Sequence, residues 1–326
     1  MSDSSQGRAL VIGEALVDAV RRPDGSRDEF PGGSPANVAL GLARLGRRAD
    51  LLTWLAPDAQ GDLVRHHLEA SGVRVLRGDR TPATTPVATA HLDDAGVATY
   101  EFDLEWDLPS SWDEEDDDPV VVHTGSIAAA LTPGAPKVAD LLERRRATST
   151  TTYDPNIRPA LMGDPADVLP VVERLVRASD VVKVSDEDLA WLVPGVAPAE
   201  VAEGWSRSGP ALVVVTHGAD GAFASTSAGA RLSVPAPRVT VADTVGAGDS
   251  FMAGLIDGLW SAGLLGAGRR AALHDADAGT VEDVLARCAR IAAITVSRPG
   301  ANPPTGDELV DAATGLLDAV ATGADA

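Results

Sequence analysis

The chain has 326 residues, 44% of them hydrophobic, and carries a formal net charge of −21 at pH 7. This composition indicates a globular protein with a large core, and the negative charge argues against nucleic acids and membrane surfaces as partners. The one cysteine, Cys288, excludes an internal disulfide. No apolar stretch is long enough for a secretory signal or a membrane span, so we expect a cytoplasmic protein.

Short runs rich in β-branched residues predict buried strands at residues 9–12, 120–123, 150–154, 181–184 and 211–216. The longer stretches between most of them have helical spacing. Val38, Leu42 and Leu45, for example, recur at i, i+4 and i+7. Strands that alternate with helices predict an α/β fold with a mostly parallel sheet covered on both faces. Ligands of such sheets bind beyond the carboxyl ends of the strands.

Two stretches depart from this alternation. Residues 17–30 contain the turn signal Pro23-Asp-Gly25, and residues 87–102 alternate in polarity around Asp93-Asp-Ala-Gly96, as a hairpin does. We expect them to form a small β-sheet lid, built from about residues 17–31 and 85–107, on a single domain that spans residues 1–326.

The segment Asp243-Thr-Val-Gly-Ala-Gly-Asp249 precedes an apolar helical stretch. Small residues at a helix start let backbone N–H groups converge on an anion, and the helix dipole adds to the attraction. An ionised aspartate in that turn can accept a proton from a hydroxyl group. The segment therefore fits phosphoryl transfer to a sugar. The alternative is a glycine-rich helix start that Asp249 caps.

A second glycine segment, Gly32-Gly-Ser-Pro-Ala-Asn37, opens another predicted helix, which ends near Gly46. Ser34 is expected to cap this helix at its N-terminus, and Gly46 suits its C-terminal end. Capping does not explain the paired glycines. The amide of Asn37 offers both a donor and an acceptor to a polyol.

These two segments, in this order, resemble the signatures of the ribokinase-type (PfkB) family of carbohydrate kinases. The N-terminal signature matches at Gly32, Gly33, Asn37, Gly46 and Gly61, and the C-terminal one matches from Asp243 to Gly254. The resemblance extends over residues 9–305. It implies a ribokinase-like three-layer α/β/α sandwich with a lid, and an ATP-dependent sugar kinase, a phosphotransferase with an alcohol group as acceptor.

The resemblance also implies roles for individual residues. Asp249 is the implied catalytic base, and the amides of Gly246, Ala247 and Gly248 form the implied anion hole. The residues implied to bind the sugar are Asp18, Gly32, Gly33, Asn37 and Arg158. Those implied to bind ATP are Lys183, Thr216, Gly218, Gly221, Ala301 and Asn302.

Two metal ions are implied as well. Transfer from ATP calls for magnesium, which neutralises charge on the phosphates. The family often has Asn-x-x-Glu for this purpose, whereas this chain has Ser185 and Asp188 at those positions. Asp188 is expected to act through water, with Glu187 as the alternative. Asp243 matches a residue beside a monovalent cation, usually potassium.

The sugar itself stays open. Four segments resemble bacterial fructokinases: Glu14 to Asp18, His123 to Ser126, Asp154-Pro-Asn-Ile-Arg158, and Lys183 to Glu187. The arginine motif also occurs in 2-keto-3-deoxygluconate kinases, where a guanidinium matches the carboxylate of the substrate. We therefore expect fructose, with ketodeoxygluconate or ribose as alternatives.

Other classes of protein fit less well. The dinucleotide fingerprint of nicotinamide-dependent oxidoreductases is absent after Gly13, and no P-loop motif occurs. A catalytically silent sugar-binding regulator remains an alternative, although the retention of Asp249 argues against it. Many relatives pair through their lids, so the resemblance implies a homodimer.

Overall fold

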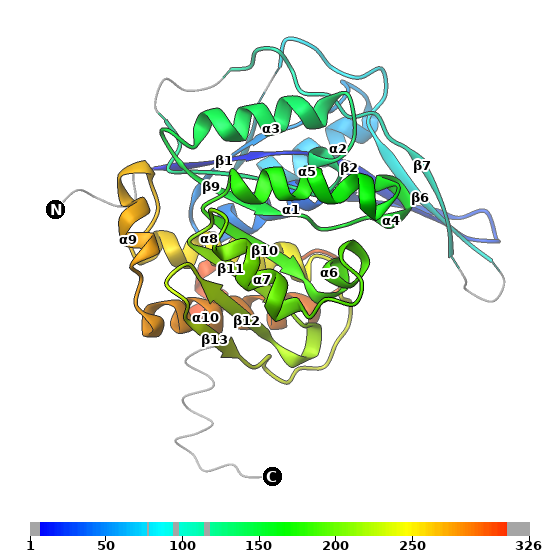
Figure 1. Ribbon diagram of the computed structural model, residues 1–326. Coiled ribbons are helices and arrows are strands. Elements are labelled where there is room, and N and C mark those ends of the chain that lie inside the picture. Colours follow the sequence, from blue (N-terminus) through cyan, green and yellow to red (C-terminus); the bar gives the residue numbers. More distant parts are fainter. Residues whose placement is uncertain (1–6, 77, 94–97, 114–117, 312–326) are drawn as a thin grey trace.

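The computed structural model describes residues 7–76, 78–93, 98–113 and 118–311 (Figure 1). Its larger sheet has nine strands in the order β13-β12-β11-β10-β9-β8-β1-β4-β5. All neighbours run parallel except β12, which is antiparallel to both β11 and β13. The strands are β1 (Arg8–Ile12), β4 (Arg48–Leu52), β5 (Val73–Leu76), β8 (Val121–Gly125), β9 (Thr150–Asp154), β10 (Val181–Ser185), β11 (Leu212–Thr216), β12 (Ala222–Thr226) and β13 (Arg231–Val234).

Helices cover both faces of this sheet because adjacent strand residues point to opposite sides. Val11 joins a core with α1 (Ser34–Arg44), α2 (Ala59–Glu69), α8 (Ala247–Ser261), α9 (Arg270–His274) and α10 (Ala278–Val296). Leu10 joins a second core with α3 (Gly134–Arg145), α5 (Pro165–Arg177), α6 (Asp186–Leu192) and α7 (Pro198–Ser206). Figure 1 shows α3 and α5 side by side on this second face. The predicted α/β class with a mostly parallel sheet is confirmed.

A smaller sheet of four strands, in the order β3-β2-β6-β7, stands beside the larger one. It consists of β2 (Leu16–Arg21), β3 (Arg27–Gly32), β6 (Val87–Leu92) and β7 (Ala98–Asp103). Its two hairpins are antiparallel, and β2 joins β6 in parallel. Figure 1 shows β6 and β7 extending away from the main body. The strands come from the two stretches that departed from the helix–strand alternation. Residues 94–97, at the tip of the second hairpin, lie outside the described part.

The start of α1 differs from the prediction. Ser34 does not cap this helix: the N-cap is Gly33, with no side-chain hydrogen bond, and Ser34 is the first helical residue. Its hydroxyl points instead at Asp249 on α8. The predicted end is confirmed, since Gly46 follows the helix with a φ of +88° and donates its N–H to the Ala43 carbonyl.

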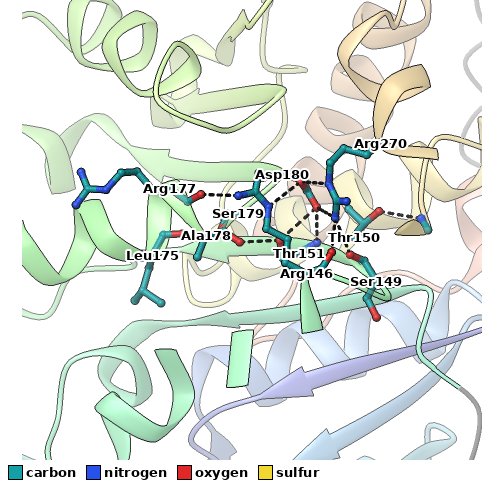
Figure 2. Close-up of polar contacts among 11 residues, drawn as sticks. Arg146, Ser149, Thr150, Thr151, Leu175, Arg177, Ala178, Ser179, Asp180 and Arg270 are labelled. Atoms are coloured by element: carbon teal, nitrogen blue, oxygen red, sulfur yellow. Dashed lines mark hydrogen bonds and ion pairs between the residues drawn. The ribbon is translucent and has the colours of Figure 1, made fainter. Parts of the chain in front are cut away.

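A buried charge network fixes the amino ends of β9 and β10 (Figure 2). Asp180 is fully buried and accepts a hydrogen bond of 2.9 Å from the Thr151 N–H. The guanidinium of Arg270 lies 2.7 Å from the same carboxylate, that of Arg146 lies 3.4 Å away, and Arg270 also donates to the Ser149 carbonyl. Because a buried charge without a partner is costly, these contacts hold α9 and the two strand starts together. The opposite, carboxyl ends of the strands carry the candidate site.

Candidate active site

The first turns of α1 and α8 meet at the carboxylate of Asp249. The helices approach closely, since a Cβ on Gly41 would lie 2.7 Å from that of Ala253. Asp249 is 9% exposed; Ser34 Oγ donates to its Oδ1 at 2.6 Å and Asn37 Nδ2 donates to its Oδ2 at 2.8 Å. Two donors from α1 thus fix the orientation of a carboxylate on α8. Asp249 does not cap its own helix, so the capping alternative is wrong.

The glycine turn leaves amide groups free at the start of α8. Gly246 is the N-cap in the left-handed region, with φ +76° and ψ 3°. A Cβ there would lie 2.7 Å from that of Ala301, so glycine is required both for conformation and for space. The Ala247 N–H donates weakly to the Thr244 carbonyl at 3.3 Å. Within the described part of the chain, the N–H of Gly248 has no backbone acceptor. Together with the helix dipole, this turn suits an anion.

The paired glycines lie where the small sheet joins the main body. A Cβ on Gly32 would fall 2.1 Å from Asp18 Oδ2, and one on Gly33 would fall 2.5 Å from the Glu14 carbonyl. Gly33 also has a φ of +103°, which disfavours any side chain. Both glycines therefore let the backbone pass close to Asp18 and the β1–β2 connection.

Asp18 keeps contact with solvent, but the surrounding protein strips much of its hydration, and this raises its pKa to about 6. The Arg158 guanidinium lowers this pKa, and the Asp249 carboxylate raises it. Arg158 is itself exposed and donates to Asn156 Oδ1 at 2.9 Å and to the Ile157 carbonyl at 3.0 Å. Asp18, Arg158 and Asp249 therefore act on one another electrostatically, from three separate elements.

Lys183, which was predicted to bind ATP, pairs with a buried carboxylate in this structure. Its side chain is almost completely buried, and its Nζ is 2.7 Å from Oδ2 of the fully buried Asp154. Burial raises the pKa of Asp154 to about 6, although Lys183 opposes this. Burial also disfavours the charged form of Lys183, but Asp154 outweighs it, and the pKa of Lys183 is raised.

The other residues predicted to bind ATP lie at the carboxyl end of β11, in the turn between β11 and β12, and in the loop after α10. Thr216 ends β11, in register with Ser185 of β10. Gly221 has a φ of +102°, and a Cβ there would meet the Val234 carbonyl at 2.1 Å. Gly218 opens the turn between them with a φ of +50°. Asn302 accepts a hydrogen bond from Arg44 of α1, and Ala301 packs on the glycine turn as described above.

Asp188 and Asp243, the carboxylates predicted to act on metal ions, accept hydrogen bonds from backbone N–H groups. Asp188 accepts from the N–H of Ile157 at 2.9 Å and that of Ser185 at 3.3 Å, while Glu187 is exposed. Asp243 accepts from Val245 and Gly300, at 3.0 and 2.9 Å. The described residues contain no group of three or more His, Cys, Asp or Glu side chains that could hold a metal. An ion here would take most of its ligands from phosphates, water or carbonyl groups.

Sequence reasoning assigned no role to Ser34 beyond capping, and none to Glu14 or Asp154 individually. A signal was present for Asp154, because a charged residue that ends a buried strand is unusual unless it has a partner. No sequence pattern reveals that Ser34 faces Asp249, since 215 positions separate them.

Comparison with known proteins identifies the family. Residues 6–307 match the pfkB family carbohydrate kinase model. The chain belongs to this family. It is 35% identical over 263 residues to a fructokinase from Rhizobium leguminosarum bv. trifolii. The aligned region covers 77% of this chain and 79% of that protein. The predicted family and the predicted activity of an ATP-dependent sugar kinase are confirmed.

Solved structures of carbohydrate kinases share this fold. A fructokinase from Xylella fastidiosa with bound ATP matches with a TM-score of 0.82 and 25% identity, over 95% of this chain and 99% of that one. A fructokinase from Vibrio cholerae, bound to fructose, ADP and a potassium ion, has a TM-score of 0.79 at 24% identity over the same shares. The second likeness establishes the fold alone. None of the helices in the described ranges is long and apolar enough to cross a membrane.

Glu14 makes stability depend on pH. It is buried and accepts from the Ala128 N–H at 3.1 Å; burial raises its pKa to about 7 from 4.5, although hydrogen bonds and Arg158 oppose this. Between about pH 4.5 and 7, Glu14 therefore keeps its proton in the folded state but releases it in the unfolded state. Protonated Glu14 favours the folded state, and this contribution to the free energy of unfolding is lost as pH rises through that range.

We expect Glu14→Gln, which stays neutral, to gain about 2–3 kcal/mol in unfolding free energy relative to the parent chain between pH 5 and pH 8. Urea unfolding at several pH values measures this difference, and Asp154 and Asp18 contribute equally to both proteins. Parallel stability curves would show that Glu14 titrates normally in the folded state.

Proposed function

We propose that this kinase is a fructokinase, which converts D-fructose and ATP to fructose 6-phosphate and ADP. The observation that carries the proposal is the Asp249 carboxylate, oriented by Ser34 and Asn37 beside the free amides of α8. The choice of fructose is supported by the 35% identity to a fructokinase over most of the chain.

In the proposed mechanism, Asp249 accepts the proton of the sugar's primary hydroxyl. The hydroxyl oxygen forms a bond to the γ-phosphorus of ATP, and the bond between that phosphorus and the bridging oxygen of ADP breaks. The amides of Gly246, Ala247 and Gly248 lie at a helix N-terminus, where the dipole stabilises the charge on the transferred group. The hydrogen bonds from Ser34 and Asn37 fix Asp249, so little reorganisation is needed.

Asp18, Gly33, Asn37 and Arg158 are the proposed contacts of the sugar, and closure of the small sheet over it would exclude water. The balance of charge favours a neutral acceptor. The guanidinium of Arg158 interacts with the Asp18 carboxylate and lowers its pKa. Because this carboxylate offsets the charge of Arg158, a sugar acid such as ketodeoxygluconate gains less from Arg158 than from an isolated guanidinium.

Magnesium fits as an ion bound mainly by the phosphates of ATP, with Asp188 in contact through water. The carboxylate of Asp188 lies at the site, since its charge acts on Lys183 and Asp154. When bound, the ion neutralises charge on the phosphates. Potassium fits near Asp243, whose two amide contacts leave further lone pairs free. Thr216, Gly218, Gly221, Ala301 and Asn302 are the proposed neighbours of the nucleotide.

A coupled assay for ADP, with a panel of fructose, ribose and ketodeoxygluconate, tests the substrate. We expect the kcat/KM for fructose to exceed that for each other sugar by at least about tenfold, and omission of potassium to lower the rate. A higher kcat/KM for either competitor would contradict the choice of fructose. Sugar binding without turnover of any member of the panel would favour a silent regulator.

We expect Asp249→Asn to lower kcat by about 100-fold or more with little change in the sugar KM, because the amide keeps the shape but accepts no proton. Asp18→Ala is the contrasting variant, since loss of a sugar contact should raise KM more than it lowers kcat. Near-normal kcat in Asp249→Asn would remove Asp249 from the role of base.

We also propose that a second copy of this chain covers one face of the small sheet. Tyr100 and Phe102 are exposed and stack at 6.1 Å, and exposed Phe30 lies on the same face, directly across from Asp18. Trp106 is buried and belongs to the core. Exposed aromatic residues that gather in this way mark interfaces. Sedimentation velocity should give a dimer that Tyr100→Asp weakens, and a monomer at all concentrations would exclude this partner.

A further inference from the structure

A buried ion pair lies behind the first turn of α8. Lys183 lies in the middle of β10, and Asp154 is the last residue of β9, the neighbouring parallel strand. Their charged atoms are 2.7 Å apart, and the two side chains are only 4% and 0% exposed. Within the described part of the chain, Asp154 Oδ1 has no hydrogen-bond partner. Burying two charges is costly, and a pair that leaves a lone oxygen unsatisfied does not recover that cost fully. Stability alone is thus a poor reason for this pair.

The lysine reaches the glycine turn itself. Its Nζ donates to the Gly248 carbonyl at 3.4 Å, and a Cβ on Gly248 would lie 2.9 Å from that nitrogen. Gly248 therefore does more than expose its own amide, since it also makes room for the ammonium. Asp249, the next residue, lies directly beyond this contact.

The residue type at position 183 also matters. Of the 27 cationic residues, 25 are arginines, and the two lysines are Lys137 and Lys183. An ammonium is a compact point charge, which suits a position 2.7 Å from Asp154 and close to Gly248 better than a larger planar guanidinium.

The groups around Lys183 are mainly acidic. The charges of Asp154 on β9, Asp249 on α8 and Asp188 on α6 all raise its pKa, so the ammonium stays charged. His123 on β8 is the other basic neighbour, but burial, aided by Lys183, lowers its pKa to about 3. His123 is therefore neutral at pH 7 and does not compete with Lys183 for the neighbouring carboxylates. Asp18 on β2 is a further carboxylate in this group, and the charge of Asp249 raises its pKa.

From this geometry we propose that Lys183 is an electrostatic positioning residue: held by Asp154, it fixes the first turn of α8 and supplies positive potential behind Asp249 and the anion-binding amides. This inference rests on the proposed role of Asp249 as base, and it holds for whichever sugar the enzyme phosphorylates. The potential favours negative charge on the phosphoryl group.

Lys183→Met tests the proposal, because methionine matches the length of the side chain without its charge. We expect kcat to fall by about 10- to 100-fold while the sugar KM changes by less than about threefold. A purely structural role would lower the fraction of folded enzyme or disturb the sugar KM as well, rather than lower kcat alone. The assay uses whichever sugar the parent enzyme turns over, so a wrong choice of fructose does not affect it.

Two further variants complete the experiment. Lys137→Met is the matched control: Lys137 also pairs with an aspartate, Asp107, but away from the site, and this variant should keep the parent kcat. If Lys183→Met fails to fold, Lys183→Met/Asp154→Asn removes both buried charges, and its kcat should still be at least about tenfold below the parent value. A folded Lys183→Met enzyme with kcat within threefold of the parent value overturns the proposal, as does a double variant with near-parent kcat.

Discussion

Two hydrogen bonds across a helix–helix contact hold the site together. Ser34 and Asn37, both in the first turn of α1, donate to the two oxygens of Asp249 in the first turn of α8. Each helix starts after a glycine in a conformation that disfavours side chains. The contact between the two helix starts therefore depends on the backbone conformation as well as on the side chains. The proposed sugar-binding and phosphate-binding halves of the site are thereby joined through one carboxylate.

Charged groups of both signs surround the carboxylate of Asp249. Asp18 and Glu14 face Arg158 on the side of the small sheet, whereas Asp154 holds Lys183 on the side of the large sheet. A kinase must bring a polyanion toward a carboxylate base, and those groups repel each other. Free amides, the helix dipole and a buried ammonium offset that repulsion without placing a cation where the sugar hydroxyl must lie.

Much of the fold was predictable, because buried parallel strands have a local signature. The runs at residues 150–154 and 181–184 are continuous and β-branched, and they coincide with β9 and nearly with β10. The hairpin signal between residues 87 and 102 was equally local. Ser34 shows where such reasoning ends: its position suits an N-cap, but a partner 215 residues away decides what its hydroxyl does.

The sequence by itself determined the family and the kind of reaction, and it singled out Asp249 as the candidate base, because glycine turns and strand ends are local features that a signature records. Only the tertiary structure decided which groups surround that carboxylate. Lys183 could be matched to a nucleotide-side motif, yet the sheet places its ammonium against Asp154 and the Gly248 carbonyl. The physical reason is that desolvation and charge coupling depend on distances between β9, β10 and α8, and those distances exist only after the strands have paired.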